Sequence, residues 1–171
     1  MVAMMLGTAG ADRMFGTATA DWMLGGAGDD YMDGANGNDY LSGHLGNDTL
    51  YGGLGDDRLD GGEGKDFLNG GRDNDNLTGG AEADTFAFDL VALDWRGNER
   101  SLTAGNDVVT DFKVGEDDLQ FNMRGDFDDL NFRQVGADTV ITFDEVGGSV
   151  TLTGVNLESL LQHQSSDFVF L

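Results

Sequence analysis

Residues 25–69 read GGAGDDYMD, GANGNDYLS, GHLGNDTLY, GGLGDDRLD and GGEGKDFLN, five consecutive units of nine residues. The pattern continues without insertion on both sides, with GTAGADRMF and GTATADWML before it and GGRDNDNLT and GGAEADTFA after it. All nine units begin with Gly, carry Asp at position 6 and have a large apolar residue at position 8. Composition bias alone would scatter these residues, so residues 7–87 form a structural repeat.

The nine-residue period predicts a turn followed by a short strand. The first six positions are rich in Gly, Asn and Asp, which tolerate the positive φ angles of tight turns. In the three residues that follow, position 8 points inward while positions 7 and 9 point outward. Each unit buries only one apolar side chain, so stability requires stacking of neighbouring units. We therefore predict an all-β fold, a right-handed parallel β-roll in which two repeats make one coil.

The charge of the chain indicates cations as partners. The chain has 32 acidic and nine basic residues, a net charge of −23, no Cys and no Pro. This charge argues against nucleic acids and anionic membranes, and the lack of Cys excludes disulfides and thiolate-bound metals. No apolar run approaches the roughly 18 residues of a membrane-spanning helix.

Stacking would align the position-6 carboxylates in two columns, five from the odd repeats and four from the even repeats. Neighbouring carboxylates about 4.8 Å apart would repel by ~3 kcal/mol at an effective dielectric constant near 20. A divalent cation between them converts repulsion into attraction, and oxygen ligands without His or Cys favour Ca²⁺. We expect the ion-free repeats to be largely unfolded and Ca²⁺ to drive their folding.

The repeats resemble the calcium-binding nonapeptide G-G-x-G-x-D-x-U-x of the RTX, or hemolysin-type, proteins. The resemblance implies that each Ca²⁺ lies between repeats i and i+2, bound by the position-6 carboxylates and by backbone oxygens of positions 1 to 4, with at most seven sites. The implied ligands are Asp12, Asp21, Gly25, Gly26, Ala27, Gly28, Asp30, Gly34, Ala35, Asn36, Gly37, Asp39, Gly43, His44, Leu45, Gly46, Asp48, Gly52, Gly53, Leu54, Gly55, Asp57, Gly61, Gly62, Glu63, Gly64, Asp66, Gly70, Asp75, Gly79 and Asp84.

Some repeats depart from this pattern. Thr19 replaces the position-4 Gly of the second repeat, so sites that use this repeat are not favoured. Asp73 and Glu82 do so in the last two repeats, where they would either clash or add a carboxylate ligand. We expect the best sites to pair the third repeat with the fifth, the fourth with the sixth and the fifth with the seventh.

The C-terminal half, residues 88–171, predicts a β-rich cap on the roll, and residues 1–6 predict an N-terminal cap or junction. After a polar insertion at residues 89–103, residues 104–121 predict two short strands about a Gly115 turn, and residues 138–155 predict a hairpin. Asn156 would cap a short helix, and residues 167–171 predict a last strand. This half is similar to the C-terminal region of serralysin-type RTX exoproteins, which implies a type I secretion signal at the end, the type I secretion machinery as partner and an extracellular location.

The sequence predicts no catalytic function. It contains no H-E-x-x-H zinc motif, nucleophile elbow or P-loop, and its only histidines, His44 and His163, have no partner motif. An alternative function comes from aromatic residues at outward strand positions, namely Trp22, Tyr31, Tyr40, Tyr51 and Phe67. They predict either strand-to-strand stacking alone or a polysaccharide- or surface-binding accessory module of a secreted enzyme such as an alginate epimerase or a protease.

Overall fold

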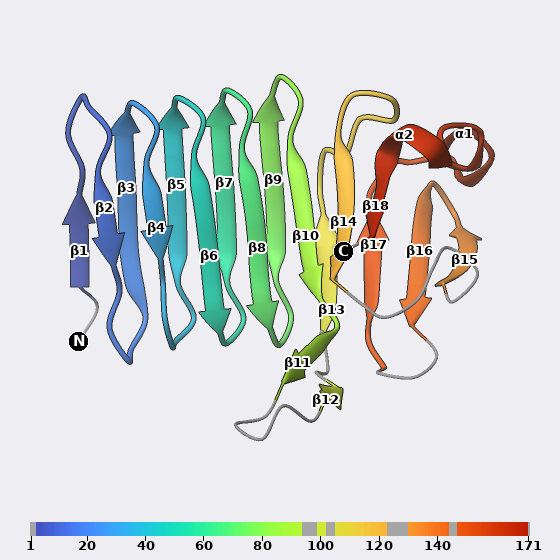
Figure 1. Ribbon diagram of the computed structural model, residues 1–171, viewed down its shortest axis with the longest axis horizontal. Helices are drawn as coiled ribbons and strands as arrows, with labels where there is room; N and C mark the ends of the chain where they lie inside the picture. The colour runs from blue at the N-terminus through green and yellow to red at the C-terminus, as the bar shows by residue number, and fades with distance from the viewer. Residues whose placement is uncertain (1–2, 94–98, 102–104, 123–129, 144–146, 171) are drawn as a thin grey trace.

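A computed structural model describes residues 3–93, 99–101, 105–122, 130–143 and 147–170 of the chain. Two long sheets face each other along the molecule, as the prediction of a parallel β-roll required (Figure 1). Odd-numbered strands of the repeats build one sheet and even-numbered strands the other. The strands of the roll are β1 (Ala3–Leu6), β2 (Arg13–Phe15), β3 (Asp21–Ala27), β4 (Tyr31–Asp33), β5 (Tyr40–Leu45), β6 (Thr49–Leu54), β7 (Arg58–Glu63), β8 (Phe67–Arg72), β9 (Asn76–Ala81) and β10 (Thr85–Asp89).

Parallel pairing places equivalent positions of alternate repeats side by side. Leu41 pairs with Leu59 between β5 and β7, and Leu50 pairs with Leu68 between β6 and β8. All nine position-8 residues are buried: Met14 is 8% exposed and the other eight, through Phe86, are 0% exposed. The thin core between the sheets is therefore a column of single Met and Leu side chains, as the repeat predicts.

The sheets do not end with the nonapeptides. Strand β13 (Asn106–Val109) adds in parallel to β9, and β14 (Asp118–Asn122) adds in parallel to β10. The two strands expected about Gly115 therefore exist, but they lie in different sheets and continue the coil. The predicted boundary at residue 87 marks the end of the nine-residue register and not the end of the stacked sheets.

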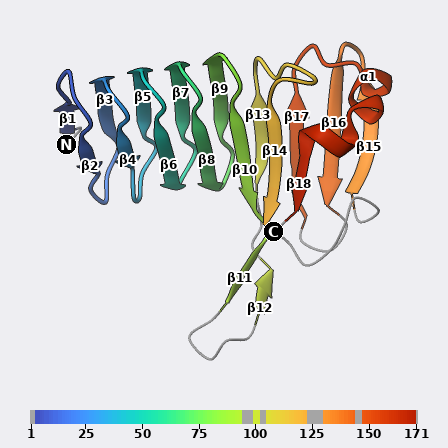
Figure 2. The same ribbon diagram turned by 45° about the horizontal axis from the view of Figure 1, so that its top comes forward.

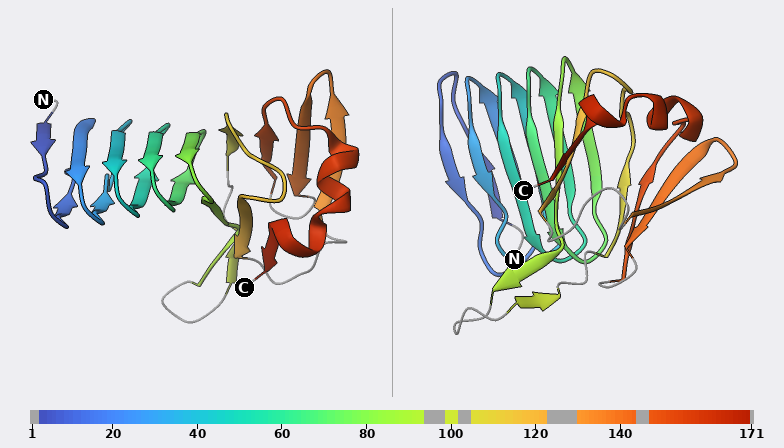
Figure 3. Two further views of the ribbon diagram at one scale, coloured as in Figure 1. Left: turned by 90° about the horizontal axis from the view of Figure 1, so that it is seen from above. Right: turned by 45° about the vertical axis from the view of Figure 1, so that its right-hand side comes forward.

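The far end of the molecule is antiparallel. Strands β15 (Leu130–Val135), β16 (Asp138–Phe143) and β17 (Ser149–Leu152) form an antiparallel group, with β17 also parallel to β13, which confirms the predicted hairpin. Asn156 Oδ1 accepts the Ser159 N–H and caps helix α1 (Leu157–Gln162), as expected. Helix α2 (Gln164–Asp167) leads into the last strand, β18 (Phe168–Phe170), which pairs with β14. Figure 3 shows this end beside the regular coils.

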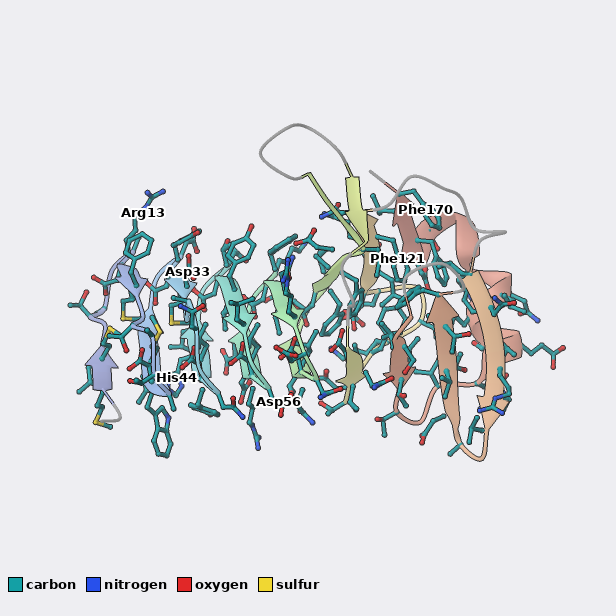
Figure 4. All side chains as sticks on the ribbon, turned by 90° about the horizontal axis from the view of Figure 1, so that it is seen from below. Arg13, Asp33, His44, Asp56, Phe121 and Phe170 are labelled. Atoms are coloured by element: carbon teal, nitrogen blue, oxygen red, sulfur yellow. The ribbon has the colours of Figure 1, made fainter. Side chains whose placement is uncertain are left out.

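An aromatic cluster fills the space between the roll and the antiparallel strands. The Phe121 ring lies 5.5 Å from that of Phe88, 5.8 Å from Phe143 and 6.1 Å from Phe168, measured between centroids. The labelled Phe121 and Phe170 lie at this end of the molecule (Figure 4). Large rings here replace the single aliphatic side chains of the roll.

Within the predicted polar insertion, β11 (Val91–Leu93) and β12 (Glu99–Ser101) pair antiparallel and project away from the roll (Figure 2). Residues 94–98 and 102–103 of that insertion lie outside the described residues, as do Ala104, the first residue of the next predicted segment, and Leu171 of the predicted secretion signal. Within the described residues, no helix is both long and apolar enough to cross a membrane.

Candidate calcium-binding ladders

The position-6 aspartates form two columns of buried carboxylates along the edges of the roll. In each column, Oδ1 of one Asp accepts the backbone N–H of the Asp two repeats earlier. Asp48 Oδ1 lies 2.7 Å from Asp30 N, and Asp57 Oδ1 lies 2.7 Å from Asp39 N. One oxygen of each carboxylate therefore links successive coils through a hydrogen bond to the backbone.

Two aspartates beyond the repeats continue these columns. Asp107 Oδ1 accepts from Asp75 N and Asp117 Oδ1 accepts from Asp84 N, each at 3.0 Å. The odd ladder thus consists of Asp12, Asp30, Asp48, Asp66, Asp84 and Asp117, and the even ladder of Asp21, Asp39, Asp57, Asp75 and Asp107. The signal for both was in the sequence: residues 105–109 (GNDVV) and 115–119 (GEDDL) keep Gly, Asp and the apolar residue at the spacing of positions 4, 6 and 8.

The second oxygen, Oδ2, has no protein partner along the middle of the ladders. Seven such atoms are buried without a hydrogen bond, those of Asp30, Asp39, Asp48, Asp57, Asp66, Asp75 and Asp84. Their residues are only 1–3% exposed. A buried carboxylate oxygen without a partner costs several kcal/mol. Because the oxygens repeat in one position of every coil, a cation is the group that suits them.

The position-1 glycines shape the space beside these oxygens. A Cβ added to Gly43 would lie 2.0 Å from Asp48 Oδ2 and 2.7 Å from the carbonyl oxygen of Gly61, two repeats ahead. At Gly25, Gly34, Gly52 and Gly61, an added Cβ would likewise lie within 3 Å of one Asp Oδ2 and of one Gly carbonyl oxygen two repeats ahead. We call these five places the cradles. Each offers hard oxygen ligands from two repeats, which fits Ca²⁺.

The loops hold the conformation that turns carbonyl groups inward. Position 2 adopts a left-handed φ of 73° at Ala35 and 74° at His44, although neither is Gly. At position 4, Asp73 and Glu82 do the same with φ of 74° and 75°, and both are exposed. Such angles cost ordinary residues about 1–3 kcal/mol and persist only where the surroundings enforce them. The departures from Gly therefore leave the loop path intact.

The first two repeats close their loops differently. Thr8 donates its N–H and its Oγ1 hydroxyl to Asp12 Oδ2, at 2.6 and 2.9 Å. Thr17 makes the same two bonds to Asp21 Oδ2, at the same distances. Since protein groups already satisfy these oxygens, Asp12 and Asp21 are the least suited of the predicted ligands.

Burial raises the pKa of the ladder carboxyls from Asp30 to Asp117, with smaller increases from neighbouring rungs in most of them. The pKa rises to about 8 for Asp57 and Asp75, to about 7 for Asp84 and Asp107, and to about 6 for Asp48 and Asp66, although backbone N–H groups oppose the rise where they bond to Oδ1. Without a cation, Asp57 and Asp75 in the folded ladder therefore favour the protonated form at neutral pH, while Asp84 and Asp107 lie near half protonation. A bound dication supplies the positive charge that lets them ionise.

The remaining candidate residues lie away from any cluster. His44 is exposed near the end of β5, and His163 follows helix α1 as its C-cap. Among the described residues, no group of three or more His, Asp or Glu side chains could hold a metal ion. A cation in a cradle would therefore take much of its coordination from backbone oxygens.

Comparison with known proteins agrees with this geometry. The family model described as the RTX calcium-binding nonapeptide repeat (4 copies) matches residues 6–41, 33–68 and 60–89. No curated protein matches the chain. Among solved structures, the extracellular lipase LipA from Serratia marcescens is similar in fold, with a TM-score of 0.50 and 18% identity. That match covers 100% of this chain and 40% of the lipase.

Two further structures are subunits of the Azotobacter vinelandii mannuronan C5-epimerase. The AlgE6R3 subunit gives a TM-score of 0.36 and 23% identity over 95% of this chain and 80% of that one. The AlgE6R2 subunit gives 0.41 and 23% over 97% and 91%. The family match rests on the repeats themselves, which are also the source of both carboxylate ladders. Residues 6–89 of the chain therefore consist of RTX calcium-binding nonapeptide repeats.

Proposed function

We propose that this chain is a non-catalytic module that folds when it binds extracellular Ca²⁺ and that supports type I secretion and stability of the secreted protein. The observation that carries the proposal is the row of seven buried Oδ2 atoms without a protein partner. The family match supports calcium-binding repeats, and it matches a repeat module and not a catalytic family.

The cradles favour five ions among the seven sites that the repeats allow. They pair the third repeat with the fifth, the fourth with the sixth, the fifth with the seventh, the sixth with the eighth and the seventh with the ninth. In each site the carboxylate comes from the earlier repeat of the pair; these carboxylates belong to Asp30, Asp39, Asp48, Asp57 and Asp66. The three sites that the sequence favoured are among them. The carbonyl ligands at positions 1 to 4 form part of the same proposal.

The C-terminal segment supports export before folding. Asp167 is 1% exposed and its Oδ2 accepts the Gly115 N–H at 2.9 Å, while Phe168 pairs with Leu119 in the sheet. The start of a secretion signal at residues 167–171, namely Asp167 and Phe168, would therefore be buried in the folded chain. The secretion machinery would have to read it while the chain is unfolded, as in a cytosol with little free Ca²⁺.

A single methyl group placed in a cradle tests the proposal. Gly43→Ala puts a Cβ 2.0 Å from Asp48 Oδ2. We expect the number of bound Ca²⁺ ions, counted by native mass spectrometry, to fall by one, with a loss of about 1–3 kcal/mol from overpacking. The matched control is Gly10→Ala, because a Cβ there meets nothing within 4 Å. A wild-type chain that binds no Ca²⁺, or a Gly43→Ala count equal to that of wild type, would contradict the proposal.

A second candidate function, polysaccharide binding, is favoured by one surface of the seven-stranded sheet. Phe15, Tyr31, Tyr51 and Phe67 form a row of ring contacts, with centroids 5.7–5.8 Å apart. A groove of about 340 Å³ runs beside Tyr31 and Tyr51 and is also lined by polar side chains, those of Asp33, Asn69, Arg72 and Asp89. Asp33 lies on the same side of the molecule as Arg13 (Figure 4). Aromatic faces beside hydrogen-bonding groups suit sugar rings.

Tyr51→Ala tests this second function. Removal of one aromatic face, worth about 0.5–1.5 kcal/mol, would weaken binding of an oligosaccharide roughly two- to tenfold. Isothermal titration calorimetry of the calcium-loaded chain measures this change. Trp22→Ala is the control, because Trp22 pairs with Tyr40 on the other sheet. Equal affinities in wild type and Tyr51→Ala would leave the aromatic row with a stacking role only.

A further inference from the structure

The segment after β13 folds back onto the loop of the ninth repeat. The Asp111 carboxylate accepts the N–H groups of Gly79 and Gly80, at 2.9 and 2.8 Å. Two residues later, the Lys113 ammonium donates to the carbonyl oxygen of Gly80 at 2.7 Å and to that of Glu82 at 3.4 Å. This segment therefore brings a positive charge onto the inward-turned carbonyls of the loop.

The two carbonyls occupy positions 2 and 4 of the ninth repeat, and Asp84 of the odd ladder is position 6 of the same loop. In the proposed sites, backbone oxygens of these positions and the position-6 carboxylate face the cation. The Lys113 ammonium donates to the two carbonyls, while Asp84 Oδ2 has no hydrogen-bond partner among the described residues. The charge of the ammonium opposes the effect of burial on the pKa of both Asp84 and Asp117, so it lies close to two successive rungs.

Lys113 also satisfies the last rung of the odd ladder. Its backbone N–H donates to Asp117 Oδ2 at 2.8 Å, and its ammonium lies 3.9 Å from Glu116 Oε1. At the opposite end of the same ladder, the Thr8 N–H and hydroxyl satisfy Asp12 Oδ2. Protein donors thus close both ends of the odd ladder, and the orphaned oxygens lie between them.

We propose that the Lys113 ammonium takes the calcium position between the ninth repeat and the turn that follows it, as a cation built into the chain. This inference rests on the proposed calcium-binding function. It follows that a fixed positive charge offsets part of the negative charge of the last coil of the odd ladder at any Ca²⁺ concentration. The coil nearest the C-terminal cap can then serve as the template on which calcium-bound coils stack.

The test counts ions in Lys113→Met, which keeps the aliphatic stem and removes the charge. At saturating Ca²⁺, native mass spectrometry is expected to find one more bound ion than in wild type. In a Ca²⁺ titration followed by circular dichroism, the folding midpoint should move to a higher concentration, because one more ion must bind. Lys65→Met is the matched control, since Lys65 is the only other lysine and is exposed; it should keep the wild-type ion count.

An equal ion count in Lys113→Met and wild type, with Ca²⁺ bound to both, would overturn the Lys113 proposal alone. A wild-type chain without bound Ca²⁺ would instead overturn the proposed function. If Lys113→Met fails to fold, the proposal can be tested on the calcium-loaded wild type by measuring how fast an amine-specific reagent acetylates each lysine. Lys113 is expected to react at least tenfold more slowly than Lys65, and equal rates would overturn the proposal.

Discussion

Removal of calcium at pH 8 is expected to unfold the roll. The ladders then hold buried carboxylate oxygens without partners at seven rungs. The desolvation penalty is several kcal/mol per buried ion, so that even a few ionised rungs outweigh the 5–15 kcal/mol by which domains are typically stable. We expect far-ultraviolet circular dichroism to show loss of the β signal in excess chelator and its return in millimolar Ca²⁺.

Two controls separate ligation from charge screening. NaCl at matched ionic strength should not restore the β signal, because it screens exposed charges and leaves buried ones unpaired. Mg²⁺ should restore less signal than Ca²⁺, since it is smaller and gives up its water reluctantly. The same β signal in chelator and in Ca²⁺ would contradict the proposal that ions hold the ladders together.

The second large effect is a reversal of pH dependence by calcium. In the ion-free fold, burial raises the pKa of Asp57 and Asp75 to about 8 and that of Asp48 to about 6, above the ordinary value of 3.8. The folded chain therefore binds more protons than the unfolded chain between about pH 4 and 8. Its stability is greatest below this window and falls as the pH rises, by about 1.4 kcal/mol per pH unit for each proton involved.

With Ca²⁺ the sign changes, because protons and Ca²⁺ compete for the same oxygens. Affinity for Ca²⁺ should rise between pH 5 and 8, while the urea midpoint of the ion-free chain should fall. Asp57→Asn removes one rung and should flatten the pH dependence of the ion-free chain. Asp60→Asn, at an outward position of β7, is the matched control. An ion-free chain equally stable at pH 5 and pH 8 would show that the ladder carboxyls do not control folding.

The repeated part of the fold is predictable from sequence because the residues that specify each turn and strand lie within the same nine-residue unit. Gly at position 1, Asp at position 6 and one apolar residue at position 8 fix the turn, the edge and the core of every coil. The in-register pairing of Leu41 with Leu59 follows from identical spacing alone. The family match on residues 6–89 recovers the same repeats.

The end of the roll was less predictable. Asp107 and Asp117 extend the ladders across an insertion that breaks the period, so counting nine residues at a time misses them. The shorter Gly-x-Asp-x-apolar spacing would have found both. Parallel pairing of β13 with β9 joins residues far apart in sequence, and local patterns do not specify such contacts.

Closure of the ladder ends depends on individual side chains. Thr8 and Thr17 stand at position 2 of their repeats, where the family pattern has Gly, and in the structure they donate to Asp12 and Asp21. Lys113 lies outside the repeats, and its bond to the Gly80 carbonyl depends on how the chain folds back after β13. Hydrogen bonds of this kind follow from tertiary geometry and have no periodic signature.

The most direct measurement is a crystal structure grown in calcium and recorded at a wavelength where calcium scatters anomalously. We predict an anomalous peak in each of the five cradles, between the Asp Oδ2 and the Gly carbonyl two repeats ahead, and none at the Lys113 ammonium. Cradles that hold only water, with Oδ2 atoms of Asp30 to Asp66 hydrogen-bonded to it, would contradict the account.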